Sequence, residues 1–397
     1  MSGTRPRTKA AVATGAAVVG AAALAGPALD ALIARAERRL NPVAGGDPGP
    51  VSDRALALHA TLRVADLHAD SLLWGRDLLK RGERGHTDVP RMIEGRVMLQ
   101  CLSASVKVPA RMNLERNTDG TDAVRALAIG GRWPPRTWGS LLERALFLAD
   151  RAHRLADRSA GTFRLIETSL DLEIHFERVA RSGPSAAGLL TIEGAHALED
   201  DPANVEVVAD AGFRMISPAH FFDTAFGGSA HGVEQPGLTP KGREMLRRME
   251  ARRVLLDVAH ASARTVDDAI ALATRPIVAS HTGARGVCDN ARNLSDAHLV
   301  GIAATGGLIG VGFWPTACGG ADAAAIARSI DYVVNLVGVE HVALGSDWDG
   351  AVPVPFDAAN VVRLTDALLE IGFEESAIRA VMGENVLRLL AEQLPSV

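Results

Sequence analysis

The 397-residue sequence has little of several features that mark particular classes of protein. Its three cysteines, Cys101, Cys288 and Cys318, lie far apart and outside any C-x-x-C motif, which argues against a thiolate zinc site and a disulfide framework. Neither G-x-G-x-x-G nor G-x-x-x-x-G-K-[ST] occurs, so the common phosphate-binding loops are missing. With a formal net charge of -5, the chain has no excess of basic residues that would attract nucleic acid, and we expect no nucleic-acid partner.

The N-terminus differs in composition from the rest of the chain. Arg5, Arg7 and Lys9 precede an uncharged, Ala-rich run over residues 10–29, a pattern typical of a secretory signal or membrane anchor. An Ala-rich helix packed on the body is the alternative. A Pro/Gly-rich stretch follows and indicates a linker. We therefore predict a signal- or anchor-like segment, a linker and one folded domain, at residues 1–39, 40–53 and 54–397.

Short apolar or β-branched runs recur through the folded domain, separated by longer stretches with apolar residues at helical spacing. This alternation predicts parallel strands joined by crossover helices, and eight such units favour a closed (β/α)8 TIM-type barrel. An open doubly wound sheet is the alternative, although it would ordinarily carry a Gly-rich phosphate loop. Residues 108–164 are expected to cross the barrel mouth and then form a helix. The eight runs span residues 63–68, 96–106, 187–194, 213–220, 252–260, 275–281, 306–313 and 341–350.

Six of these runs end in residues that can bind a metal or a proton. In a (β/α)8 barrel the C-terminal ends of the strands meet at one mouth, so these side chains should share a pocket. Any one of them alone could be an ordinary hydrogen-bonded residue. Together they favour metal binding, because buried acids and imidazoles cost free energy unless they are paired or coordinated. The residues are His68 with Asp70, Glu193, His220, His260, His281 and Asp347.

Imidazoles and carboxylates without a thiolate suit zinc, with manganese and cobalt as alternatives. The ligands suffice for two ions, and Glu193 is the natural bridge between them. Arg292, in the loop after His281, could bind a carboxylate through its planar fork or be an ordinary surface arginine. Asp347 is placed to move a proton, and Asp349 is expected to cap the next turn.

Several longer motifs surround these residues, in the order "DLHAD", "DVPRMIEGRVMLQ", "TIEGAH", "SPAHFFD", "GLTPKG", "LLDVAHAS", "ASHTGARGVCDNARNLSD", "GSDWDG" and "GENVLR". Their order and spacing resemble the membrane dipeptidase (renal dipeptidase) family of binuclear zinc peptidases, from about Leu62 to Arg388. The stretch "HFFDTAFGGSAHG" is similar to a bacterial branch of the family.

The resemblance implies a zinc-dependent dipeptidase that hydrolyses the amide bond of small dipeptides. It assigns His68 and Asp70 to one zinc, His260 and His281 to the other, and Glu193 to the bridge. It further implies that His220 contacts the scissile carbonyl, that Arg292 holds the substrate's C-terminal carboxylate and that Asp347 handles the proton.

The family also makes a homodimer plausible. With the N-terminal pattern it suggests a place in the bacterial envelope, exported or anchored through residues 10–29, with the cytoplasm as the alternative. Two other functions stay open: a related metal-dependent amidohydrolase acting on a lactam, an N-acyl amino acid or a cyclic amide, and a non-enzymatic binding protein. A first-strand H-x-H and a lysine bridge would favour the wider amidohydrolase group, whereas this chain has H-x-D and Glu193.

Overall fold

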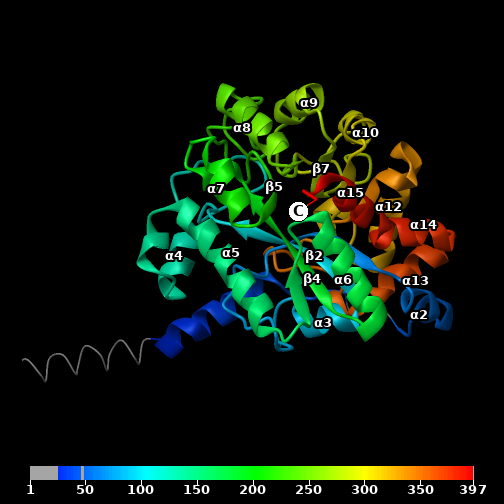
Figure 1. Ribbon diagram of the computed structural model, residues 1–397. Helices are drawn as coiled ribbons and strands as arrows, with labels where there is room; N and C mark the ends of the chain where they lie inside the picture. Colours follow the sequence, from blue (N-terminus) through cyan, green and yellow to red (C-terminus); the bar gives the residue numbers. More distant parts are fainter. Residues whose placement is uncertain (1–25, 46–48, 397) are drawn as a thin grey trace, which may run out of the picture.

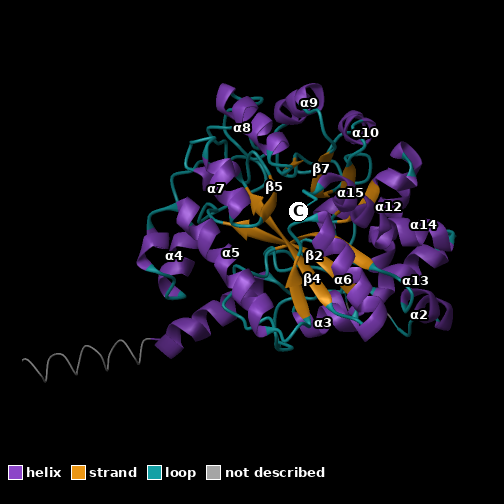
Figure 2. Cartoon of the chain, in the orientation of Figure 1, coloured by secondary structure: helices purple, strands orange, loops and turns teal. Residues whose placement is uncertain are grey.

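The computed structural model describes residues 26–45 and 49–396, and its centre is a closed ring of parallel strands (Figures 1 and 2). The strands follow the order β2-β1-β9-β8-β7-β6-β5-β4-β3, and the additional pairing of β2 with β4 closes the ring. The strands are β1 (Val64–Ala69), β2 (Val97–Ser105), β3 (Phe163–Leu165), β4 (Ala186–Glu193), β5 (Phe213–Ile216), β6 (Leu255–Asp257), β7 (Ile277–Thr282), β8 (Leu308–Val311) and β9 (Val342–Leu344).

The predicted (β/α)8 barrel is confirmed, since each of the eight apolar runs overlaps one strand of the ring. The ninth strand, β3, was not expected. It pairs with β4 at Ala186–Gly188, while β5 pairs with the same strand at Leu190–Ile192. The short β3 therefore extends the sheet at the N-terminal end of β4 and leaves the ring intact.

Helices surround the ring, and most of the longer ones begin at a side chain that accepts a backbone N–H. Ser140, Thr168, Thr239 and Ser262 cap α5, α6, α8 and α9 in this way. The described helices are α2 (Asp53–His59), α3 (Val89–Glu94), α4 (Ala123–Gly130), α5 (Leu141–Arg158), α6 (Ser169–Ser182), α7 (Asn204–Asp210), α8 (Pro240–Ala251), α9 (Ala263–Leu272), α10 (Asp296–Ala304), α11 (Pro315–Cys318), α12 (Ala323–Val337), α13 (Val362–Glu370), α14 (Glu375–Arg379) and α15 (Asn385–Gln393), with short turns η1 (Pro135–Trp138), η2 (Ala195–Leu198), η3 (Val339–His341), η4 (Ala358–Asn360) and η5 (Ala380–Glu384).

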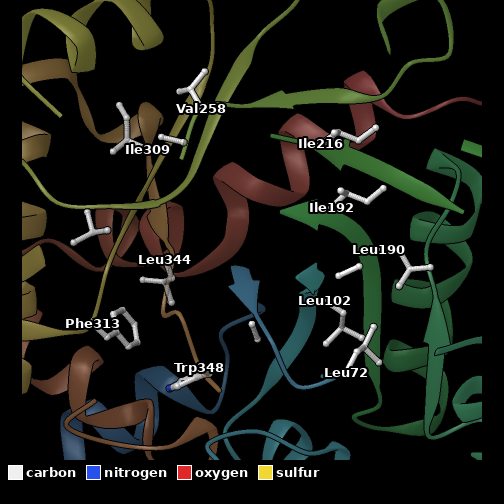
Figure 3. Packing of buried hydrophobic residues seen from close by; sticks show 14 of the residues in the cluster. Leu72, Leu102, Leu190, Ile192, Ile216, Val258, Ile309, Phe313, Leu344 and Trp348 are labelled. Carbon is white, nitrogen blue, oxygen red and sulfur yellow. The ribbon is translucent and has the colours of Figure 1, made fainter. Parts of the chain in front are cut away.

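Two hydrophobic clusters hold the barrel together. The larger one joins the strands to the outer helices, and Figure 3 shows part of it, with Leu190 and Ile192 of β4. The smaller one contains Leu189 of β4, residues from the other strands and Leu390 of α15. Because strands from all sides of the ring contribute to this smaller cluster, it fills the barrel interior. Adjacent strand residues point to opposite faces, so Glu193 shares the inward face of Leu189.

The N-terminal helix, defined here as residues 26–40, is drawn in dark blue in Figure 1 and runs outward from the body of the protein toward the lower left, and Glu37 is its one buried residue. Most of the Ala-rich run, residues 10–25, lies outside the described residues, so membrane association and the division into three segments stay predictions. Within residues 26–45 and 49–396, no helix has the length and apolar character needed to cross a membrane.

Candidate metal centre

The ends of the strands bring all of the predicted site residues together. His68 lies in β1, Glu193 ends β4 and His281 lies in β7. The others occupy the loops that follow the strands. All eight side chains are buried: His68, Asp70, Glu193, His220, His260, His281, Arg292 and Asp347.

The carboxylate of Glu193 is at the middle of this group. Its Oε1 lies 3.2 Å from His260 Nε2, 3.3 Å from His281 Nε2 and 3.6 Å from His68 Nε2. Its Oε2 lies 3.4 Å from His220 Nε2. Glu193 is therefore within reach of imidazoles from four strand ends, as expected of a bridging ligand.

On the other side of His68, two more carboxylates face the same imidazole. Its Nε2 lies 3.6 Å from Asp70 Oδ2 and 3.9 Å from Asp347 Oδ1. The candidate ligand atoms fall into three overlapping groups, and within each group they lie within 4.8 Å of one another: His68, Glu193 and His281; Glu193, His220 and His260; and His68, Asp70 and Asp347.

Several of these buried atoms have no hydrogen-bond partner among the described residues: His68 Nε2, Asp70 Oδ1 and Glu193 Oε2. In addition, the Nε2 atoms of His260 and His281 lie 3.1 Å apart. Buried polar atoms are normally satisfied, and two ring nitrogens so close repel each other unless a proton or cation lies near. The set of nitrogen and carboxylate donors fits divalent cations such as zinc.

A second layer of residues sets the orientation of His281. Its Nδ1 lies 2.8 Å from Ser280 Oγ, and that hydroxyl lies 2.6 Å from Asp257 Oδ2. The hydroxyl has one proton, which it donates to Asp257, so it accepts the Nδ1–H of His281. The Nε2 of His281 is then left with a lone pair directed at Glu193, the tautomer that a metal ligand needs.

A similar network fixes β1. Asp66 is buried within that strand, and its carboxylate accepts hydrogen bonds from the Ser346 N–H at 2.8 Å and from Gln100 Nε2 at 2.6 Å. It thereby links β1 to β2 and to the loop that carries Asp347. Of the alternate polar residues in the first strand, Asp66 is structural, whereas His68 and Asp70 reach the centre.

Burial and mutual charge shift the pKa values in the centre. Burial lowers the pKa of His260, His281 and His220 well below the usual value, so these imidazoles are neutral and can donate lone pairs. Burial also raises the pKa of Glu193 well above its usual value. For His68, burial is outweighed by Glu193 and Asp70, and the pKa rises to about 10. The crowded carboxylates thus favour a cation near His68.

Arg292 also faces this centre. Burial lowers its pKa to about 10, but the group stays charged at neutral pH. Its Nη2 donates to the carbonyl of His281 at 2.7 Å, and the guanidinium lies 5.3 Å from the ring centre of Trp314. That bond is the single hydrogen bond of this guanidinium within the described chain, so other donors are available to a ligand.

Asp349, expected to cap the next turn, has another role. Its buried carboxylate accepts from Ser71 Oγ at 2.7 Å and from the His86 N–H at 2.6 Å, and it pairs with Arg76. It therefore anchors the Asp347 loop to the segment that follows β1.

The centre opens into a cavity of about 400 Å³, a size suited to a small molecule. Its floor is polar and includes Asp70, Glu193, Arg292 and Asp347. Its upper wall is mostly apolar and includes Leu40, Leu73, Val108, Met112, Leu114, Val124, Leu127 and Val352.

Comparison with known proteins identifies the family. The model of the family described as membrane dipeptidase (peptidase family M19) matches residues 52–395. The chain belongs to this family. The predicted family is thus confirmed, and so is the prediction of a metallo-dipeptidase, a hydrolase of peptide bonds.

Individual proteins resemble the chain in sequence or in fold. An uncharacterised protein from the pqqA 5′ region of Klebsiella pneumoniae is 33% identical over 60% of this chain and 91% of its own length. Dipeptidase tcpJ of Claviceps purpurea is 27% identical over 78% of this chain and 69% of its own. A metallo peptidase structure from Rhodobacter sphaeroides, solved with a phosphinate mimic of the dipeptide L-Ala-D-Ala, has the same fold with a TM-score of 0.67, 23% identity, and coverage of 84% of this chain and 99% of that one.

Proposed function

We propose that this metallo-dipeptidase binds two zinc ions and hydrolyses small dipeptides with a free C-terminal carboxylate. The observation that carries the proposal is the position of Glu193, whose Oε1 lies within 3.6 Å of the Nε2 atoms of His260, His281 and His68. The last of these imidazoles also faces Asp70. Bound divalent ions would supply water activation and polarisation of the scissile carbonyl.

In this proposal, other residues around the centre bind the substrate and stabilise the negative charge that develops on its carbonyl oxygen. Arg292 binds the substrate carboxylate with its free donors. His220, held neutral by burial, donates a hydrogen bond to the carbonyl oxygen as negative charge develops there. Geometry alone also permits His220 as a metal ligand, since its Nε2 lies 3.4 Å from Glu193 Oε2; the family resemblance favours the carbonyl role.

Asp347 is the proposed proton carrier. Burial raises its pKa to about 7, an effect that Asp70 adds to and that His68 opposes. A carboxylate with a pKa near the working pH can accept a proton and return it to the departing amine nitrogen.

The requirement for a small substrate is supported by the size of the cavity, about 400 Å³, and by the position of Arg292 in its floor. A charged group that binds a terminal carboxylate discriminates against substrates in which that carboxylate is amidated. The solved relative from Rhodobacter sphaeroides, with its bound mimic of L-Ala-D-Ala, suggests testing D-residues at the C-terminal position as well.

The test combines metal analysis with a substrate panel. The purified chain is assayed for zinc by mass spectrometry and for hydrolysis of L,L- and L,D-dipeptides, their C-terminal amides and N-acyl amino acids, before and after chelation. We expect two zinc ions per chain and chelator-sensitive hydrolysis of the free dipeptides. Preferred hydrolysis of lactams, cyclic amides or N-acyl amino acids would instead establish the amidohydrolase alternative.

A further inference from the structure

The N-terminal helix supplies part of the wall of the substrate cavity. Ala36 and Leu40 line the same cavity as Glu193 and Arg292. Yet the match to the family model begins at residue 52. One side of the pocket is therefore built from residues that precede the family domain.

A buried charge fixes this helix in place. Glu37 is fully buried, although its neighbours along the helix, Arg38 and Arg39, are exposed. Its carboxylate pairs with the guanidinium groups of Arg76 and Arg84. Arg76 also pairs with Asp349, two residues after the predicted proton carrier, so Arg76 connects the helix to the loop that carries Asp347.

The residues after the helix continue along the same loop. Asn41 Oδ1 accepts a hydrogen bond from the Ala351 N–H at 2.8 Å. The Ala44 N–H donates to the Val354 carbonyl at 2.8 Å, and Val43 forms a parallel bridge with Val354. Backbone and side-chain contacts thus hold the entire stretch from residue 37 to residue 44, so its position at the cavity is defined.

The wall that this stretch completes is apolar. Leu40 keeps 41% of its surface exposed, and Met112 and Leu114, which line the same cavity, keep 40% each. Side chains of this kind gain free energy when a ligand covers them. The polar floor recognises the peptide bond and the carboxylate, which leaves the apolar wall to contact a substrate side chain.

We propose that Ala36 and Leu40, together with Leu73, Met112 and Val352, form a subsite for an apolar side chain of the substrate, so that the N-terminal helix determines substrate selectivity. This inference rests on the proposed dipeptidase function. It makes the substrate class narrower: dipeptides with at least one large aliphatic side chain.

The test compares Leu40→Ala with Leu32→Ala in the full chain. Leu32 belongs to the same helix, is 62% exposed and lies outside the cavity lining, so it is a matched control. The readout is the ratio of kcat/KM for Leu-containing to Ala-containing dipeptides, measured with the varied residue at the first and then at the second position. We expect Leu40→Ala to lower this ratio at one position by about 4- to 16-fold, as for one or two lost methylene contacts. Leu32→Ala should keep the wild-type ratio.

Phosphinate dipeptide analogues with a Leu or Ala side chain are titrated by calorimetry with the same variants, so that the subsite is also tested without turnover. The subsite proposal would be overturned if wild type and Leu40→Ala had the same ratio for Leu-containing to Ala-containing ligands. It would also be overturned if Leu40→Ala and Leu32→Ala changed that ratio equally. If the wild type hydrolyses no dipeptide but binds the analogues with the expected selectivity, the proposed function fails and the subsite stands. Zinc content and melting temperature are measured for each variant, to separate selectivity from misfolding.

Discussion

At the scale of single residues, the proposed metal centre depends on hydrogen bonds made by the residues behind its candidate ligands. Ser280 Oγ hydrogen-bonds both the Nδ1 of His281 and the carboxylate of Asp257. These two hydrogen bonds leave the Nε2 of His281 free to bind a metal. We predict that Ser280→Ala weakens zinc binding by about 10- to 100-fold, because His281 loses its tautomer-setting partner. Competition with a chromophoric chelator measures the affinity. Ser329→Ala is the control, since Ser329 is equally buried and its hydroxyl has no partner in the described chain; a similar loss in both variants would contradict the role of Ser280.

Arg292 provides a second prediction at this scale. Replacement by Lys keeps the charge but removes the planar fork, so Arg292→Lys should raise KM for free dipeptides by about 10- to 100-fold. C-terminal amides, which lack the carboxylate, should show no such change. Arg285→Lys in the same loop is the control, because Arg285 is exposed and donates to the Asn293 carbonyl instead. An unchanged KM for several dipeptides would argue against carboxylate binding.

The pKa of Asp347 leads to a prediction for the pH dependence of the reaction. Burial raises this pKa to about 7, and cations bound beside it would lower it. Below its pKa the carboxyl is protonated and cannot accept a proton, so kcat/KM should fall with decreasing pH along an acid limb with its midpoint no higher than about 7. Rate profiles from pH 5 to 9 measure this. Asp347→Asn should be nearly inactive over the whole range while keeping its zinc; an active Asp347→Asn would exclude the role.

The position of most candidate ligands at strand ends predicted that these side chains lie together, as the structure shows, whereas the hydrogen bonds of Ser280 and Asp257 were not predicted. His68, Glu193 and His281 are polar residues at the ends of apolar runs, and that position has a clear physical meaning in a parallel barrel. A serine or aspartate next to such a residue is common in any sequence. Its importance follows from the hydrogen bonds across β6 and β7, which sequence spacing does not reveal.

At the scale of secondary-structure elements, hydrophobic period predicted the strands of the ring but missed β3. That strand, Phe-Arg-Leu, is only partly buried and has an arginine at its centre, so it forms no apolar run, and it depends on pairing with β4. The N-terminal helix illustrates a related limit. Its contact with the barrel depends on Glu37 meeting Arg76 and Arg84, and no local pattern indicates which charged residue of a helix is buried.

Glu37 therefore provides a prediction for the helix as a unit. Glu37→Lys would place a cation beside the buried guanidinium of Arg76 and the half-buried guanidinium of Arg84. Uncompensated buried charge costs about 3–5 kcal/mol. We expect the N-terminal helix to detach and become sensitive to limited proteolysis, with a higher KM and an intact barrel by circular dichroism. Asp30→Lys makes the same charge change on the same helix, where the Asp30–Arg132 pair is exposed, and should stay resistant. Equal resistance of both variants would show that Glu37 does not hold the helix.

At the scale of the whole molecule, we expect metal binding at the centre to stabilise the folded protein. Glu193, Asp70 and Asp347 place three carboxylates in one buried site with His68, and cations relieve their repulsion. We predict that chelation lowers the melting temperature by several degrees, as ions at 1,000 times their Kd stabilise by about 4 kcal/mol. Scanning calorimetry with and without chelator measures the shift, and added zinc should restore it. A double variant, His260→Ala with His281→Ala, is the control and should show a much smaller chelator effect.

The architecture was the most predictable feature at this scale. Eight apolar runs alternating with helical stretches leave few arrangements that bury every strand, and a closed barrel is the one that removes both sheet edges. The shape of the substrate pocket was harder to predict from the sequence, because it depends on long loops and on the N-terminal helix, which meet above the barrel.

Two backbone positions at the mouth have a consequence for the evolution of this chain. His260 has a φ of 63° and Asp347 a φ of 58°, in the left-handed region that side chains other than glycine enter at a cost of about 1–2 kcal/mol. Glycine would enter this region without that cost, but glycine at position 260 would also remove a candidate metal ligand, and with it part of the stabilisation of about 4 kcal/mol expected from bound ions. The energy released by metal binding is therefore large enough to offset the backbone strain at the mouth, so the loaded barrel keeps histidine where an empty one would be more stable with glycine.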